Sequence, residues 1–271
     1  IHLENALAEF SSSDQFTTYN EENPFKDALN KSHELMGLVK NPEKVKIENI
    51  SIKSAEGFID KIDDRLSDIE DEISKLNTQI QALDADFNSL APFKGLNYTL
   101  KGIYDMDFFK YRFGKIPKVN FDKFESYLDP DINAIFITTL AETEYVYGVF
   151  FAPNEYFEEV AKDFKNINFD EIAIAKKYKD FPDKECENIL SQKEDLQKQV
   201  QAKEDSINNV IEESKTKLVS AIRRIETAYS NFDVRKLSAV TRESGVNFQV
   251  LCGWMATKEA KKLQKETDDD V

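Results

Sequence analysis

Apolar residues recur in alternating steps of three and four along residues 59–90 of the chain. Polar and charged side chains fill the positions between them, which is the heptad pattern of a coiled-coil helix. Pro92 ends the pattern because a proline cannot continue a helix. At ~1.5 Å per residue, residues 52–90 are predicted to form a helix of about 58 Å. Its seam consists of Ile59, Ile62, Leu66, Ile69, Ile73, Leu76, Ile80, Leu83, Phe87 and Leu90.

A second helical pattern follows Pro182 and extends to Phe232, with a less regular seam. Lys203 occupies an expected apolar position, and two successive steps of four, from 203 to 211, form a stutter that locally unwinds a left-handed supercoil. Two tracts of similar length can bury both seams by pairing antiparallel within one chain. We favour this hairpin over dimerisation of two chains through the same seams, because both partners are already present in the sequence.

The residues between the two tracts have a different period. Strand patterns at 107–116, 134–140, 145–151 and 169–175 are interrupted by helical patterns at 121–128 and 154–164. The order β-α-β-β-α-β is that of a ferredoxin-like fold. We expect the two helices to cover one face of the sheet. The other face is then exposed, paired, or covered by residues 96–103.

The two chain ends also carry strand patterns, at residues 1–7 and 247–255, and an antiparallel hairpin would bring them together. The predicted fold class is therefore α+β: a long antiparallel two-helix coiled coil, a ferredoxin-like α/β lobe inserted at its tip, and a second, split α/β lobe formed by the chain ends. The predicted divisions are 1–50 and 237–271 for the split lobe, 51–92 and 183–236 for the coiled-coil helices, and 93–182 for the inserted lobe.

Composition and charge exclude several classes of function. The 271 residues carry a formal net charge of −15, so the positive field required for broad nucleic-acid binding is missing. Two histidines and two distant cysteines offer little material for a zinc site, a His-based catalytic triad or a disulfide framework. Neither common nucleotide-binding glycine motif occurs. We expect a non-enzyme with no catalytic residue, cofactor, metal site or small-molecule substrate.

Two further expectations concern the surroundings of the chain. No window approaches the ~18 consecutive apolar residues that a membrane helix requires, so this chain by itself is expected to be soluble. It begins with isoleucine and shows no signal-peptide pattern, which suggests a segment of a longer protein.

The aromatic residues Tyr145, Tyr147 and Phe151 alternate along one predicted strand. This alternation fits core packing on one face of the sheet. On a face that the helices leave uncovered, the same side chains would suit a protein partner. They are the candidates for partner binding.

The order of these parts, with three short motifs, resembles the cytoplasmic N-terminal domain of the V-type ATPase membrane subunit, called subunit I or subunit a. Residues 111–117 are similar to the family's G-[KR]-[IL]-P segment, residues 248–254 to its F-x-L-x-G-W-V-P stretch, and residues 1–4 to its V-H-[LI]-x-[ED] strand. Met255 and Ala256 stand where the family has Val-Pro. The matching residues, expected to be structural, are Gly114, Ile116, Pro117, Gly253 and Trp254.

The resemblance implies a stator function. In this family the cytoplasmic half forms a collar that anchors the peripheral stalks of subunits E and G, and the C subunit is a further partner. The collar resists rotor torque while protons or sodium ions cross the membrane. The implied location is the cytoplasmic face of the cell membrane, with attachment through a C-terminal half outside this chain. The alternative is a free-standing cytoplasmic coiled-coil scaffold or tether that binds an unrelated partner.

Overall fold

The structure, a computed structural model, describes residues 2–6, 16–19, 21–126, 133–243 and 246–260. The chain forms two compact units, Ile1–Ile69 with Asp205–Val271, and Glu70–Glu204. Helices α3 (Ile52–Leu90) and α7 (Pro182–Asp233) each contribute one part to each unit. The prediction of a helix over residues 52–90 is confirmed, and the second tract is one helix that continues through the stutter.

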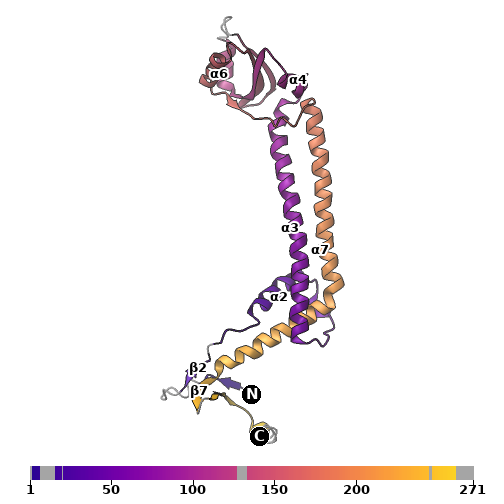
Figure 1. Cartoon of the computed structure of the whole chain (residues 1–271), viewed down its shortest axis with the longest axis vertical. Coiled ribbons are helices and arrows are strands. Elements are labelled where there is room, and N and C mark those ends of the chain that lie inside the picture. The colour runs from indigo at the N-terminus through magenta and orange to yellow at the C-terminus, as the bar shows by residue number, and fades with distance from the viewer. Residues whose placement is uncertain (1, 7–15, 20, 127–132, 244–245, 261–271) are drawn as a thin grey trace. The chain divides into compact units, whose positions relative to one another are not determined.

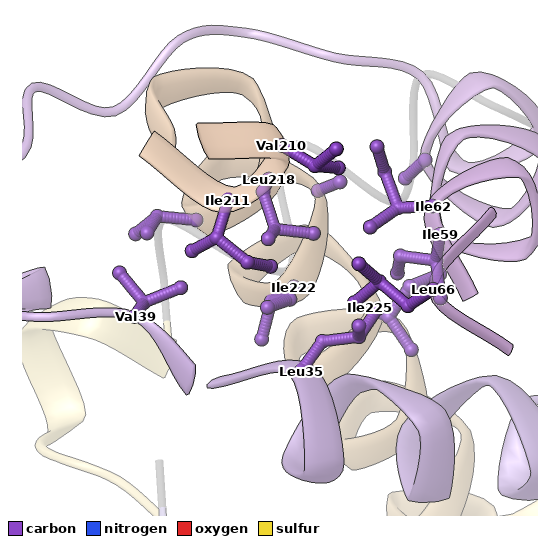
Figure 2. Packing of buried hydrophobic residues seen from close by; sticks show 13 residues of the cluster. Leu35, Val39, Ile59, Ile62, Leu66, Val210, Ile211, Leu218, Ile222 and Ile225 are labelled. Atoms are coloured by element: carbon purple, nitrogen blue, oxygen red, sulfur yellow. The ribbon is translucent and has the colours of Figure 1, made fainter. Parts of the chain in front are cut away.

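The core of the first unit contains a third helical layer, formed by α2 (Lys26–Leu38). Leu35 and Val39 at the end of α2 lie against the paired seams of α3 and α7 (Figure 2). This layer shields the seam from water on a side that two helices alone leave open. The buried members of the cluster are Leu35, Val39, Ala55, Ile59, Ile62, Leu66, Val210, Ile211, Leu218, Val219, Ala221, Ile222 and Ile225.

In the second unit the same seam is less protected. Ile73, Leu76 and Ile80 occupy seam positions of α3 but are only half-buried. The charged seam residue Lys203 forms an ion pair with Glu72 on α3. The hydrogen bond from Lys203 lowers the pKa of Glu72 below its ordinary value. A lysine is tolerated in the seam because its head group reaches a carboxylate at the solvent boundary.

Residues 93–182, called here the α/β lobe, contain a four-stranded antiparallel sheet. Its strands are β3 (Phe109–Pro117), β4 (Ile135–Ala141), β5 (Tyr145–Pro153) and β6 (Asp170–Glu171), in the order β4-β5-β3-β6. Together with α5 (Lys118–Ser126) and α6 (Phe157–Asn166), this is the predicted ferredoxin-like arrangement. The end of the helix predicted at 121–128 lies outside the described residues.

Both faces of the sheet are covered. On one face, Phe150 of β5 stacks on Phe164 of α6 with ring centroids 4.2 Å apart. On the other face, η2 (Ala91–Phe93) and α4 (Leu100–Tyr104) place apolar side chains on Phe113 and Val149. Of the three alternatives for this second face, the structure therefore shows coverage by the residues that lead into the sheet, 91–104, called here the lead-in. Figure 1 shows α4 and α6 on the same lobe as the sheet.

Two glycines face each other in the centre of the sheet. Gly114 of β3 is paired with Gly148 of β5. A Cβ on Gly114 would lie 2.3 Å from Cζ of Phe169 and 2.4 Å from the backbone oxygen of Asp170. Glycine is therefore required at position 114, in the segment that resembles G-[KR]-[IL]-P, because β6 and an aromatic ring approach it closely.

The entry and exit of the α/β lobe are hydrogen-bonded to each other. The amide of Gly95 donates to Oδ2 of Asp183 at 2.8 Å, and the amide of Leu100 donates to the backbone oxygen of Asp180 at 3.1 Å. The chain thus enters and leaves the lobe through neighbouring segments, called here the neck. This geometry allows the lobe to be inserted between two helices without separating them.

Asp86 on α3 fixes the exit segment of the neck. Its Oδ2 accepts hydrogen bonds from Tyr178 Oη at 2.7 Å and from Lys177 Nζ at 2.6 Å. Burial raises the pKa of Asp86, but the two hydrogen bonds outweigh this effect and the pKa lies below its ordinary value.

The depressed pKa makes the contribution of Asp86 dependent on pH. The carboxylate stabilises the folded state above its unfolded pKa of about 3.9, and this stability is lost as pH falls through the lower folded pKa. Asp86→Asn is expected to cost about 1–2 kcal/mol near neutral pH and progressively less toward about pH 3. Urea unfolding across this range measures the difference. The exposed Asp71→Asn is the control, and an Asp86→Asn cost independent of pH would contradict the assignment.

The chain ends form two small sheets, and the single strand predicted at 247–255 is divided between them. Strand β1 (His2–Glu4) pairs antiparallel with β9 (Cys252–Trp254), and β7 (Ala239–Glu243) lies between β2 (Thr17–Thr18) and β8 (Val246–Val250). Residues 257–260 begin the predicted last helix, whose remainder lies outside the described residues. The short helices η1 (Pro42–Lys44) and η3 (Val234–Leu237) complete the first unit.

Candidate docking surface of the α/β lobe

The candidate site is a surface. Within the described residues, no group of three or more His, Cys, Asp or Glu side chains is placed to hold a metal ion. The helices of the same residues include none that is long and apolar enough to span a membrane. Cys186 is buried and unpaired, and burial raises the pKa of its thiol.

Four large apolar side chains remain exposed on the α/β lobe around a hollow of about 200 Å³. We call Tyr98, Met106, Phe109 and Ile135 the apolar patch. Ile135 is 62% exposed and Tyr98 is 53% exposed, although both are large and apolar. Exposed apolar groups that gather around a hollow are typical of protein-binding surfaces.

The register of the sheet explains why the patch forms. Phe109 pairs with Pro153 and Ile135 pairs with Phe151, so three strands bring apolar residues to the same end of the sheet. The lead-in helix covers the middle of this face, where Ile103 and Phe113 are buried. At the end of the sheet this cover stops, and Phe109 remains 42% exposed.

The structure separates the three aromatic candidates that the sequence placed on one strand. Phe151 is 7% exposed and lines the hollow. Tyr145 lies under Lys115, whose Nζ is 4.6 Å from the ring centroid. Tyr147 is half-buried, and its backbone oxygen accepts a hydrogen bond from Thr139 Oγ1 at 3.3 Å. Only Phe151 therefore belongs to the candidate surface.

Sequence reasoning missed the members of the apolar patch. A signal was present in the adjacent residues Phe108 and Phe109, because neighbouring residues of a strand point to opposite faces. The two rings therefore cannot share one face of the sheet; Phe108, just before β3, is 80% exposed, and Phe109 is 42% exposed. Tyr98 and Ile135 gave no comparable signal, because their positions depend on how the lead-in crosses the sheet.

The motif residues have separate structural roles. Ile116 is fully buried between the sheet and its helices, and Pro117 ends β3. Gly253 and Trp254 belong to β9, which pairs with the first strand of the chain. Trp254 is 70% exposed, so its side chain is not part of a core.

These features define a class of protein: an α+β domain in which an antiparallel helix pair carries an inserted ferredoxin-like lobe and a split lobe formed by the chain ends. No protein-family model and no curated protein sequence matches the chain. Among solved structures, the crystal structure of the cytoplasmic N-terminal domain of subunit I, homolog of subunit a, of V-ATPase matches with a TM-score of 0.52 and 11% sequence identity. The match covers 97% of this chain and 92% of that chain. The chain therefore has the fold of that subunit I domain, and the resemblance inferred from the sequence is confirmed for the fold.

Proposed function

We propose that this chain is the cytoplasmic domain of a V-type ATPase subunit I and acts as a non-catalytic stator element. The observation that carries the proposal is the fold match over nearly the full length of both chains. The motif residues of β3 and β9 support it, because they fall on the sheet centre and on the pairing of the chain ends.

We further propose that the α/β lobe anchors a peripheral stalk formed by subunits E and G at the cytoplasmic face of the membrane. The apolar patch supplies the surface, since a helical coiled coil can lay apolar side chains into a hollow of this kind. Asp105 and Asp107 are exposed on either side of Met106. A stalk helix with basic residues beside its apolar face would complement them.

An aspartate in the apolar patch is expected to weaken stalk binding. Ile135→Asp places a charge where the complex buries an apolar side chain, so the dissociation constant for a purified E–G heterodimer should rise about tenfold or more. Isothermal titration calorimetry with the whole chain measures this change. Val119→Asp in α5 is the matched control, because Val119 is 68% exposed on the same lobe but outside the patch.

Two results would contradict parts of this proposal. Equal weakening by Val119→Asp would show that the patch is not the binding surface. No measurable binding of the unmodified chain at high micromolar concentration would contradict the stator function itself and favour the scaffold class.

A further inference from the structure

Strand β3 is paired unequally on its two sides. Strand β5 pairs with β3 along its whole length, from Phe109 to Pro117. On the opposite side, β6 pairs only at Gly114 and Lys115, and the amide of Ile172 donates to the oxygen of Phe113 at 2.8 Å. Backbone groups of alternate residues point to the same side of a strand. Phe109 and Tyr111 therefore direct their amide and carbonyl groups to the side where β6 has ended.

A groove of about 350 Å³ lies along this open edge, between β3 and residues 171–176. Phe109 and Tyr111 line it from the strand, and Ile172 and Ile174 line it from the departing chain. Tyr104 also lines the groove, and its buried Oη has no hydrogen-bond partner among the described residues. A strand edge beside an apolar groove is the geometry in which extended peptides bind by β-strand addition.

Among the described residues, the side chain of Arg112 covers part of the open edge. Arg112 donates from Nη1 to the backbone oxygen of Tyr111 at 3.0 Å, and its Nε is 3.1 Å from Oε2 of Glu171. The guanidinium thus replaces one hydrogen bond that a neighbouring strand would supply. Because both partners of Arg112 are partly exposed, an incoming amide can displace this contact at low cost.

The charge of the groove is opposite to that of the chain. Lys110, Arg112 and Lys176 line it together with a single carboxylate, Glu171. The whole chain has a net charge of −15, so this is a local positive site on an acidic protein. Lys110 and Arg112 lie over the ring of Phe157, on the face of the sheet that α6 covers. Tyr111 packs on the opposite face, with the lead-in residues.

We propose that this groove binds an extended acidic segment of a partner protein, which adds to the edge of β3 as a further strand. Side chains of an added strand alternate between the two faces of the sheet. Acidic side chains would meet Lys110 and Arg112 on one face, and apolar side chains would meet Phe109 and Tyr111 on the other. The preferred segment therefore alternates acidic and apolar residues. This inference does not depend on the proposed stator function.

Two fluorescent peptides of equal composition test the proposal on the whole chain. One alternates glutamate and valine over eight residues, and the other has the same residues in two blocks. The alternating peptide is expected to bind at least about tenfold more tightly in fluorescence anisotropy, because only it can match both faces. Equal binding of the two peptides would show that the groove attracts negative charge without reading the order of the residues. This result would overturn the proposal.

Charge reversal locates the peptide. Lys110→Glu with Lys176→Glu is expected to weaken binding of the alternating peptide by about tenfold or more. Lys53→Glu with Lys61→Glu is the matched control, since these exposed lysines of α3 give the same change in net charge outside the groove. Equal effects of the two double variants would contradict the assignment.

Hydrogen exchange supplies a readout that charge alone does not change. A strand added to β3 makes a new hydrogen bond to the amide of Tyr111, so exchange at this amide should slow when the alternating peptide is bound. Unchanged exchange would overturn strand addition even if the peptide binds. Because these measurements need no stalk subunit, their failure leaves the test of the stator function unaffected.

Discussion

Gly114→Ala is expected to lower the free energy required to open the sheet of the α/β lobe by about 3 kcal/mol. This is the upper end of the usual cost of overpacking. The new methyl group would lie 2.4 Å from the backbone oxygen of Asp170, which can move only if β6 leaves β3. It would also lie 2.3 Å from the ring of Phe169, which packs in the core beneath the sheet. Hydrogen exchange of the β3 and β5 amides measures the change locally.

Gly57→Ala is the matched control for this substitution. Gly57 lies within α3, and no atom is within 4 Å of the position its Cβ would take. Alanine at an open helical position should stabilise the folded chain by about 0.5–1 kcal/mol. If Gly114→Ala were neutral, or stabilising as Gly57→Ala is expected to be, the close approach of Phe169 and Asp170 would not constrain this position.

Ile62→Ala is expected to cost about 3–4 kcal/mol of unfolding free energy, because Ile62 is 3% exposed in the three-layer core with α2. The same change at Ile73, a seam position that is only half-buried, should cost about half as much. Urea unfolding followed by circular dichroism compares the two variants.

The comparison separates the helix pair from its third layer. Both isoleucines occupy the heptad seam of α3, so the intrinsic helix preferences of the two substitutions are the same. Equal costs at Ile62 and Ile73 would show that Leu35 and Val39 add no protection to the seam.

Much of the fold could be predicted from the sequence because its elements are long or strongly periodic. The heptads of residues 59–90 could fit only a helix, and the alternating residues of β3, β4 and β5 were recognisable as strands. The packing of α2 as a third layer was not predictable. Its apolar residues Leu35 and Val39 fit several partners, and their contacts with α3 and α7 are distant in sequence.

The predicted strand at 169–175 shows why the candidate surfaces were missed. The strand pattern at 169–175 predicts a strand of seven residues, but β6 contains two. The side chains of Ile172 and Ile174 instead pack against the core shared with the lead-in, so the chain turns away from β3. This early departure opens the groove, and local periodicity carries no information about it.

The insertion of the α/β lobe between α3 and α7 has a consequence for synthesis. About 90 residues separate the end of α3 from the start of α7. At ~5–20 residues per second, a ribosome completes α3 about 5–20 s before the partner helix begins to emerge. During this interval the isoleucine seam of α3 faces water, and on a polysome it lies near identical nascent chains. Because the neck joins the two ends of the lobe, early folding of the lobe holds the first turns of α7 beside the last turns of α3. Rapid closure of the neck thus favours pairing of α3 with α7 of the same chain over pairing of α3 with a helix of a neighbouring nascent chain.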